Sequence, residues 1–388
     1  MSPPERQGHA WAFAGTEITM SWSDLPADLI SAIAGRLIDL ADLAHFRLVC
    51  PSWRSASAAH AARRRIPLLL VPTEDDYRTC FKPGVWSLTD DRFREFSLPS
   101  LRGLPYLFTS HHGWMLAVET ALSAALVHPL AGGSVDLPAL PTPFRSYREK
   151  LLRDLTWDWS PHGVVVSMPG RGAFFCRPGD GSWRPIGSSS AGVTRVTYCD
   201  GAFFLFEGKT CRVIVVDAGT LAVDAMIEPP LELEAYSSWL YEVSLVVSPD
   251  ELLLVRTPLL ISEENGWRVK VFRANRGVDG RSTSWSEIAG IGGRAVFVVV
   301  DHLRAFCVEA DALSGLRGNF VYVARSYEEV HDDLGMDVSG RHTVAVLDIA
   351  VVEAVDISLK NQEKWVSMWW ESWDTFWQRP SWWLPSLH

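Results

Sequence analysis

The sequence predicts a multidomain fold in which a small all-α module of three helices precedes a large all-β domain. The chain has 388 residues, more than one ordinary hydrophobic core accommodates. Helical periodicity is confined to residues 21–65, whereas residues 66–388 consist of short β-rich runs separated by turn residues. Residues 1–20 contain two prolines, two glycines and no sustained period, so we expect a disordered leader there.

The first helix is predicted from apolar residues that recur at four-residue spacing. Leu29, Ile33 and Leu37 form one stripe, and Ile30 begins the adjoining stripe. Pro26 fits the first helical turn, because that position has no intrahelical N–H bond to lose.

Two further helices complete the module. The second is expected from Ala41 to Val49, with Asp39 as its cap. Its inward residues are expected to be Leu43, Phe46, Val49 and Cys50. Pro51 begins a third helix that carries Trp53 and an alanine-rich run. A module of about forty residues can hardly bury enough surface to be stable alone, so its apolar surplus predicts docking on the next domain or on a partner.

Beyond Pro67 the sequence predicts strands separated by Gly, Pro, Asp and Asn. The expected strands include Ile66–Val71, Tyr106–Phe108, Trp114–Val118, Ala125–His128, Gly163–Ser167, Ala173–Cys176, Arg195–Tyr198, Ala202–Glu207, Arg212–Asp217, Val243–Val247, Leu252–Arg256, Arg268–Arg273, Ala295–Val300, Phe320–Ala324 and Thr343–Ile349. No long amphipathic helix alternates with these runs, which disfavours a doubly wound α/β fold.

Groups of strands recur roughly every 40 to 50 residues. Four short antiparallel strands at that period are the pattern of one β-propeller blade. The spacing therefore favours a propeller of about six blades over a β-sandwich, and leaves five or seven blades open.

Composition and motifs exclude several classes of function. A net charge of −10 argues against nucleic-acid binding driven by global charge. The six cysteines are scattered, and no apolar run approaches 18 residues, so we expect no disulfide framework, no membrane span and a location in the cytosol or the nucleus. The adjacent His111 and His112 would point to opposite faces of a strand, which disfavours a shared metal. We expect no catalytic residue, no metal and no cofactor.

The strongest functional signal runs from Trp22 to Ala56. It reads Trp-Ser-Asp-Leu-Pro-Ala-Asp-Leu-Ile and continues through Arg36-Leu37, Asp42-Leu43, Phe46-Arg47, Val49-Cys50 and Trp53-Arg54. This pattern closely resembles the F-box motif. The resemblance implies helix-in-groove docking on a Skp-type adaptor. The implied adaptor-binding residues are Leu25, Pro26, Leu29, Ile30, Ile33, Leu37, Leu43, Val49 and Trp53.

The roles of some motif residues stay open. Ile33, Leu37 and Phe46 fit the core of the module and a partner contact about equally well. Arg47 and Arg54 fit either ion pairs at the rim of the contact or solvated surface positions.

The β domain carries a second, shorter set of motifs. Gly292-Gly293-Arg294 leads into one strand, Leu316-Arg317-Gly318-Asn319-Phe320 into another, and the chain ends near Trp382-Trp383-Leu384-Pro385. With the upstream segment His128–Pro138 and in this order behind an F-box, they resemble the KIB-type (DUF295) F-box-associated β-propeller family of plants.

Together the resemblances imply a non-catalytic substrate receptor of a Skp–cullin–F-box ubiquitin ligase. Its partners would be the Skp-type adaptor, through it a cullin, and a target protein bound on the loop-rich face or the central channel of the propeller, with no role for nucleic acid or membrane. One alternative is a binding or inhibitory protein outside any ligase. An enzyme on a propeller scaffold is disfavoured by the absence of a catalytic constellation.

Two segments near the C-terminus stand apart. The acidic residues Glu328, Glu329, Asp332, Asp333 and Asp337 predict a solvated loop, with a basic partner as the alternative. Tryptophans recur every four residues at Trp365, Trp369, Trp373 and Trp377, with Trp370, Trp382 and Trp383 alongside. That spacing predicts a helix with a tryptophan-lined face, either buried against the propeller or exposed as a substrate or membrane-interface surface.

Overall fold

The chain divides into two compact units, Met1–Ala62 and Arg63–His388. The computed structural model describes residues 22–37, 40–63, 67–71, 84–87, 92–95, 106–110, 112–119, 122–130, 132–141, 155–168, 170–187, 192–234, 241–258, 269–276, 283–299, 304–310, 316–330, 338–349, 363–370 and 381–383. The leader over residues 1–20 and the cap residue Asp39 lie outside this set.

The first unit is helical. A short 3-10 helix η1 (Trp22–Asp24) precedes α1 (Ala27–Arg36), α2 (Leu40–Leu48), α3 (Pro51–Ala56) and α4 (Ala58–Arg63). Pro26 lies just before α1, where its carbonyl accepts the N–H groups of Leu29 and Ile30, both at 3.1 Å. The predicted third helix is interrupted at Ser57 and so forms α3 and α4.

The expected inward face of the second helix is partly wrong. Leu43 and Phe46 are buried as predicted, but Val49 follows the end of α2 and is 56% exposed. Cys50, at the N-cap of α3, is half-buried. The helical period could not hold to Val49, because α2 ends one residue before it.

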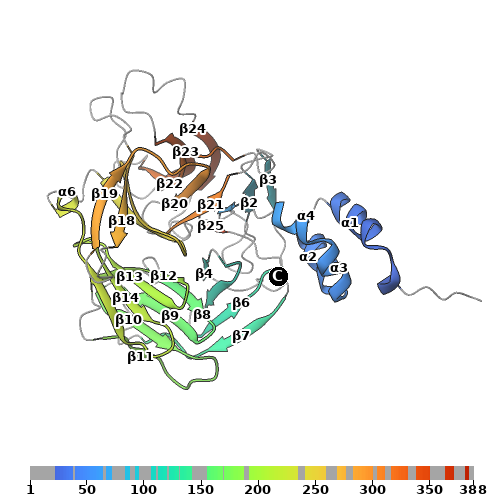
Figure 1. Cartoon of the computed structure of the whole chain (residues 1–388), viewed down its shortest axis with the longest axis horizontal. Coiled ribbons are helices and arrows are strands. Elements are labelled where there is room, and N and C mark those ends of the chain that lie inside the picture. The colour runs from blue at the N-terminus through green and yellow to red at the C-terminus, as the bar shows by residue number, and fades with distance from the viewer. Residues whose placement is uncertain are drawn as a thin grey trace, which may run out of the picture. The chain divides into compact units, whose positions relative to one another are not determined.

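The second unit is a β-propeller, and its described strands form six sheets (Figure 1). The sheet that closes the ring has the order β25 (Ser381–Trp383), β1 (Leu68–Val71), β2 (Gly84–Ser87), β3 (Arg92–Glu95). The next sheet has the order β4 (Tyr106–Thr109), β5 (Met115–Val118), β6 (Ala124–Val127), β7 (Ser134–Leu137). The sheet after it has the order β8 (Thr156–Ser160), β9 (Gly163–Met168), β10 (Gly172–Cys176), β11 (Arg184–Pro185).

Three more sheets complete the unit. They are β12 (Val193–Cys199), β13 (Ala202–Glu207), β14 (Arg212–Asp217) and β15 (Val223–Ile227); then β16 (Tyr241–Val247), β17 (Leu252–Pro258), β18 (Lys270–Arg276) and β19 (Thr283–Ile288). The sixth has five strands in the order β21 (Arg304–Glu309), β20 (Arg294–Val299), β22 (Phe320–Val330), β23 (Val338–Asp348), β24 (Glu363–Trp370). A short helix α6 (Leu231–Glu234) follows β15.

The apolar core lies between successive sheets. Along β13, Phe203 and Leu205 pack toward the β8–β11 sheet, whereas Phe204 and Phe206 pack toward the β16–β19 sheet. A strand buried on both faces needs apolar residues at every position, which explains continuous runs such as Val-Val-Val in β9 and Val-Phe-Val-Val in β20.

The first strands of the sheets meet one another around the centre of the ring, where β8 contacts β12 and β16 contacts β21. Side chains tie several of these strands together. Trp157 Nε1 on β8 donates to Phe108 O on β4 at 3.1 Å, and Thr109 Oγ1 on β4 donates to Trp382 O on β25 at 3.0 Å. Thr156 Oγ1 donates to Thr194 O at 3.1 Å, which joins β8 to β12.

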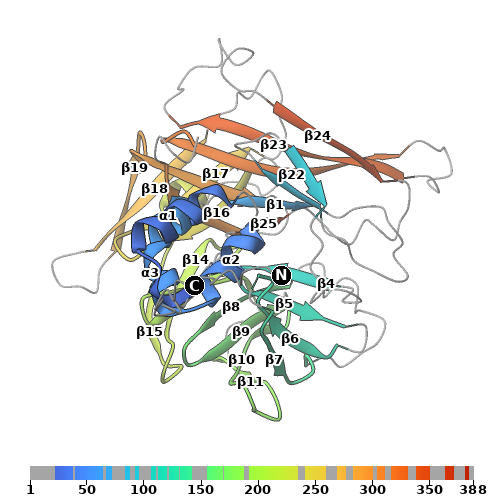
Figure 2. The ribbon, with the colours of Figure 1, turned by 90° about the vertical axis from the view of Figure 1, so that its right-hand side faces the viewer.

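The ring is closed by strands from distant parts of the chain. Leu69 on β1 pairs with Trp382 on β25 in antiparallel register, and Figure 2 shows the two strands side by side. The indole of Trp382 is buried, and its Nε1 donates to Val298 O on β20 at 3.0 Å.

Two predictions about the C-terminal part are wrong. The helix expected along the tryptophan repeat is not formed at residues 363–370, which form strand β24 and pair with β23. Spacing of four fits a strand as well as a helix, because four is a multiple of the strand period of two. Trp373 and Trp377 lie outside the described residues. The loop expected at Glu328 and Glu329 is instead the end of β22, while Asp332, Asp333 and Asp337 lie outside the described residues.

Candidate functional site

The sequence-predicted adaptor-binding residues divide into three groups by exposure. Pro26, Leu29, Ile33 and Val49 are exposed; Leu25, Leu37 and Trp53 are half-buried; Ile30 and Leu43 are buried. Leu29 is 50% exposed and Ile33 41%, whereas Ile30 is 1% exposed. The structure therefore makes Ile30 and Leu43 core residues of the helical unit in this conformation, and leaves Leu29 and Ile33 free for a partner.

The division follows from the geometry of α1. Leu29 and Ile33 are four residues apart and share one face of the helix. Ile30 and Ala34 are also four residues apart, and both are buried in the unit. The helix thus has two apolar stripes, one that forms the core and one that faces outward.

Arg47 is a structural residue and not a rim residue. It is buried, and its Nη1 donates to Arg54 O at 2.9 Å and to Ser57 Oγ at 3.1 Å. Arg54 Nε in turn donates to Arg47 O at 3.4 Å. Burial, with Arg54 nearby, lowers the pKa of Arg47. These bonds hold α2 against α3 and the break at Ser57, so the expectation of rim or surface arginines was wrong for Arg47.

One contact between aromatic rings and one hydrogen bond position the start of the unit. The rings of Phe46 and Trp53 lie 4.4 Å apart, and Trp53 Nε1 donates to Trp22 O at 3.0 Å. The side chain of Trp22 remains 73% exposed. The hydrogen bond from α3 therefore fixes η1 and presents Trp22 outward.

We define the helical docking surface as the five large hydrophobic residues that are exposed in the described part of this unit, namely Trp22, Leu29, Ile33, Leu48 and Val49. Sequence reasoning found Leu29, Ile33 and Val49 and missed Trp22 and Leu48. A signal existed for both, because Trp22 opens the motif and Leu48 precedes Val49 in it. Exposed apolar residues gathered on a small unit are typical of a protein-binding surface.

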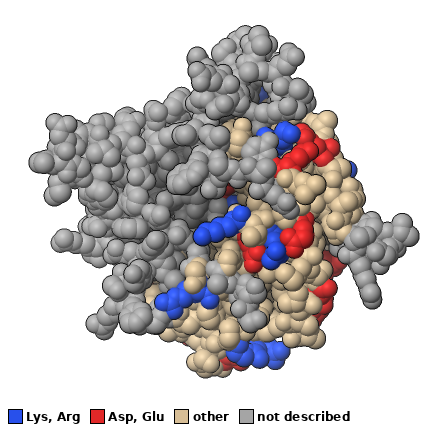
Figure 3. All heavy atoms as spheres, turned by 90° about the vertical axis from the view of Figure 1, so that its left-hand side faces the viewer, with Lys and Arg blue, Asp and Glu red and all other residues tan. Residues whose placement is uncertain are grey.

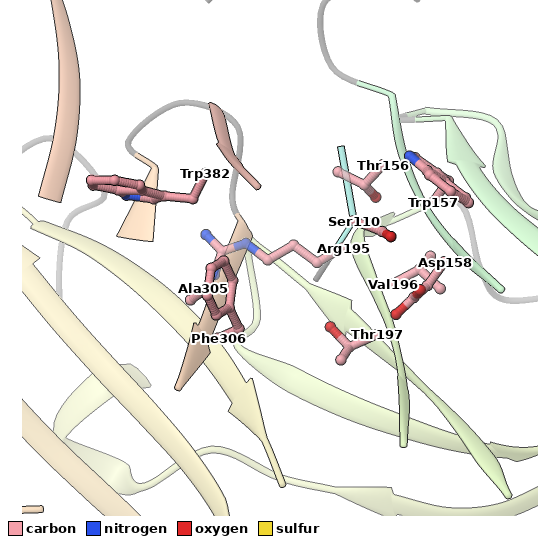
Figure 4. Close-up of a pocket in the computed structure, with 10 residues that line it drawn as sticks. All are labelled: Ser110, Thr156, Trp157, Asp158, Arg195, Val196, Thr197, Ala305, Phe306 and Trp382. Atoms are coloured by element: carbon pink, nitrogen blue, oxygen red, sulfur yellow. The ribbon is translucent and has the colours of Figure 1, made fainter. Parts of the chain in front are cut away.

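Side chains of several inner strands surround a small cavity near the centre of the propeller (Figure 4). Residues of β8, β12, β21 and β25, with Ser110 after β4, line a cavity of about 20 Å³. A cavity of that volume holds a water molecule or two and no larger ligand. This cavity is therefore not a binding site for a target side chain.

Arg195 is the main charged group at this centre. Its guanidinium donates to Glu242 Oε1 at 3.1 Å and to Val243 O, and lies over the ring of Phe206 at 4.9 Å. Burial lowers the pKa of Arg195 to about 10, and Glu242 opposes that shift. The pair joins β12 to β16 and is a structural link.

A recurring turn connects the first and second strands of two successive sheets. Ser110 Oγ accepts the N–H of His112 at 3.2 Å and donates to Trp114 O at 2.8 Å. Ser160 Oγ accepts the N–H of His162 at 3.1 Å and donates to Gly163 O at 3.2 Å. Sequence reasoning missed this Ser-x-His-Gly repeat, although it recurs in the printed sequence at the spacing of the sheets.

Aromatic side chains gather beside these turns. Half-buried His112 lies 6.4 Å from the rings of both Trp159 and Tyr198, and Trp114 lies 5.9 Å from Trp159. Asp158 lies beneath them and accepts the N–H of Tyr198 at 2.7 Å. Asp158 is 1% exposed, and this hydrogen bond joins β8 to β12.

The described part of the chain contains neither a metal site nor a membrane-spanning helix. No group of three or more His, Cys, Asp or Glu side chains there is arranged to hold a metal ion. Among the same residues no helix is long and apolar enough to cross a membrane. The predicted absence of catalytic residues stays a prediction.

Comparison with known proteins identifies similar chains. Residues 85–348 match the KIB1-4 β-propeller family. The putative F-box protein At5g55150 of Arabidopsis thaliana is 21% identical over 357 residues, which cover 84% of this chain and 90% of that protein. The F-box protein At2g05970 of Arabidopsis thaliana is 20% identical over 344 residues, covering 78% and 85% of the two chains. The F-box protein SKIP23 of the same plant is 25% identical over 246 residues, covering 54% and 59%.

Proposed function

The chain belongs to the KIB1-4 β-propeller family, and from this premise we propose that it is the substrate receptor of a Skp–cullin–F-box ubiquitin ligase. In this proposal the helical unit is an F-box that docks on the Skp-type adaptor, and through it on the cullin. The propeller binds a target protein. The chain itself performs no chemistry, and acts by raising the effective concentration of target lysines near a charged ubiquitin-conjugating enzyme.

The observation that carries the proposal is the helical docking surface. The small helical unit leaves five large hydrophobic side chains exposed among its described residues. Leu29 and Ile33 form an outward apolar stripe of α1, which suits a groove on a partner. The names of the Arabidopsis relatives, all F-box proteins, support the same identity for this partner.

Three finer features belong to the same proposal. Each of the six sheets is one blade of the propeller. The protein acts in the cytosol or the nucleus. Neither nucleic acid nor membrane is a partner, in keeping with the net charge of −10.

An adaptor-capture experiment tests the proposal. The full chain is mixed with an immobilised Skp-type adaptor, and the dissociation constant is measured for wild type and for the double variant Leu29→Asp/Ile33→Asp. We expect the variant to bind about 100-fold more weakly or worse, because two apolar anchors are replaced by charges. The matched control is Val223→Asp/Met226→Asp, which changes two equally exposed residues of the propeller and should bind the adaptor as wild type does.

The outcome also separates contact residues from core residues. Ile30→Ala should lower the melting temperature of the helical unit, because Ile30 is buried, while Leu29→Ala should not. Equal adaptor binding by wild type and the Leu29→Asp/Ile33→Asp variant would show that this surface is not used. Failure of wild type to bind any Skp-type adaptor would favour the alternative, a binding or inhibitory protein outside a ligase.

A further inference from the structure

Large hydrophobic residues are exposed at two places among the described residues. One is the helical docking surface. The other lies on the propeller and consists of Val223 and Met226 on β15 and Leu231 on α6. Leu231 is 80% exposed, the highest value among these residues. Among the propeller residues whose burial is described, these are the exposed large hydrophobic ones, which marks the segment from β15 to α6 as a candidate contact surface.

A pocket of about 380 Å³ lies beside Leu231, on the side of β15 that faces the β16–β19 sheet. Pro230, Leu231 and Glu232 form one wall, and Trp285 of β19, in the next sheet, forms the other, above the buried ring of Phe272. Trp285 Nε1 donates to Glu228 O at 2.7 Å and so fixes the two walls together. The volume suits one or two side chains of a bound segment. We call this pocket, with the exposed side chain of Leu231, the rim pocket.

The charges of the rim pocket are not balanced. Its lining includes three carboxylates, those of Glu228, Glu232 and Glu287, and no lysine or arginine. Arg212 Nε lies 2.9 Å from Glu228, and Lys270 Nζ lies 2.8 Å from Glu287. Glu232 has no ion-pair partner among the described residues. The carboxylate of Glu232 is therefore open to a cation from outside. On the described part of the face that carries α6 and β19, Figure 3 shows acidic side chains interspersed with basic ones.

The backbone beside the pocket is also open. Strand β15 is the last strand of its sheet and pairs with β14 alone among the described strands. Every residue of β15 from Val223 to Met226 is exposed. An edge strand of this kind can take up an extended peptide through main-chain hydrogen bonds.

We propose that the rim pocket binds an extended segment of a target protein in which one lysine or arginine lies beside a large apolar side chain. The basic group pairs with Glu232, and the apolar side chain packs on Leu231 and Trp285. This inference rests on the proposed function, because it names the part of the propeller that selects the target.

A peptide selection provides the test. A phage-displayed library of random heptapeptides is selected on the immobilised full chain, and the enriched sequences are synthesised with a fluorescent label for anisotropy titrations. We expect enriched peptides to carry a basic residue next to Leu, Ile, Val, Phe or Trp. Their affinity should fall roughly tenfold or more in Leu231→Asp and in Glu232→Arg.

The control variant is Asp136→Arg, which reverses a charge on β7, the edge strand of a different sheet, and should leave the affinity unchanged. If Glu232→Arg does not fold, Glu232→Gln replaces it, with a smaller expected loss. Enrichment of acidic or purely apolar peptides, or peptides that bind equally to the Leu231→Asp and Glu232 variants, would overturn the inference. So would the enrichment of no peptide.

Adaptor capture with the same proteins separates this inference from the proposed function. The Leu231→Asp and Glu232→Arg variants should still bind the Skp-type adaptor as wild type does. If adaptor binding persists and peptide binding does not depend on the rim pocket, the inference alone fails. If wild type binds no adaptor while the peptides still need Leu231 and Glu232, the ligase proposal fails and the rim pocket stands.

Discussion

Trp382 should be one of the most costly residues of the propeller to replace. Its side chain is 3% exposed, contacts the ring of Phe297 edge-on at 5.0 Å and donates to Val298 O. A tryptophan buries about 200 Å², which at about 25 cal/mol per Å² corresponds to about 5 kcal/mol. A compact unfolded state reduces this value to about 3–4 kcal/mol, and the lost hydrogen bond adds about 1 kcal/mol.

We therefore expect Trp382→Ala to lower the free energy of unfolding by about 4 kcal/mol. For a denaturant slope of about 3 kcal/mol per M, the urea midpoint of the propeller followed by circular dichroism falls by about 1.3 M. Trp382→Phe keeps most of the volume but not the N–H donor, and should cost about 2 kcal/mol. A loss of under about 1 kcal/mol for Trp382→Ala would refute the idea that β25 closes the ring.

Four other predictions concern stability and reactivity. Gly163→Ala should lower the free energy of unfolding by about 3 kcal/mol, measured by urea titration, because Gly163 has φ +150° and an added Cβ would lie 2.4 Å from Cys176 O; a neutral effect would contradict the turn geometry. Glu242→Gln should lower the free energy of unfolding by about 3 kcal/mol, because the buried charge of Arg195 loses its ionic partner. The double variant Arg195→Met/Glu242→Leu removes both charges and should lower it much less; equal losses of the two variants in thermal melts would contradict the buried pair. At pH 8 iodoacetamide should modify Cys50, whose pKa is lowered by the hydroxyl of the next serine, and not Cys176, whose pKa burial raises to about 12, as mass spectrometry of the native protein would show. Because the folded state keeps the Cys176 thiol protonated, its contribution to stability is present below about pH 9 and is lost as pH rises toward 12, and Cys176→Val should remove that part of the slope.

The sequence predicted the middle of the propeller well. Strands β13 and β14 were expected at Ala202–Glu207 and Arg212–Asp217, and these are the observed bounds. These two strands could be predicted because strands buried on both faces form unbroken apolar runs between turn residues. The match of residues 85–348 to the KIB1-4 β-propeller family confirms the resemblance inferred from short motifs in this region.

The strands that the sequence did not predict lack a local signal. Strand β25 has three residues, and its pairing partner Leu69 lies at the opposite end of the domain sequence. In β24 the tryptophan spacing fits both helix and strand, and pairing with β23 decides between them. Local preference is a weak guide wherever a distant strand supplies the hydrogen bonds.

The candidate site was predictable only in part for a similar reason. Both stripes of α1 are apolar, so the sequence could not tell that Ile30 faces the core and Leu29 faces outward. The burial of Arg47 depends on carbonyl and hydroxyl acceptors in α3 and beyond, which the helical period does not reveal. The rim pocket needs Trp285 from a neighbouring sheet to complete its wall, so Leu231 alone gave no indication of it.

The pairing of β1 with β25 also sets a condition on biosynthesis. A ribosome releases β1 long before β25, so the nascent propeller stays an open array of sheets until β25 has emerged. Bringing the two strands together closes a loop of nearly the whole domain, at an entropic cost of about 5 kcal/mol for a flexible chain, which the preformed sheets between them reduce. A message truncated before the codons for Ser381–Trp383 would yield a protein with every other sheet but an unpaired edge at Leu68–Val71. Such an edge is a recognised aggregation hazard, so β25 protects the propeller by covering the free edge of β1.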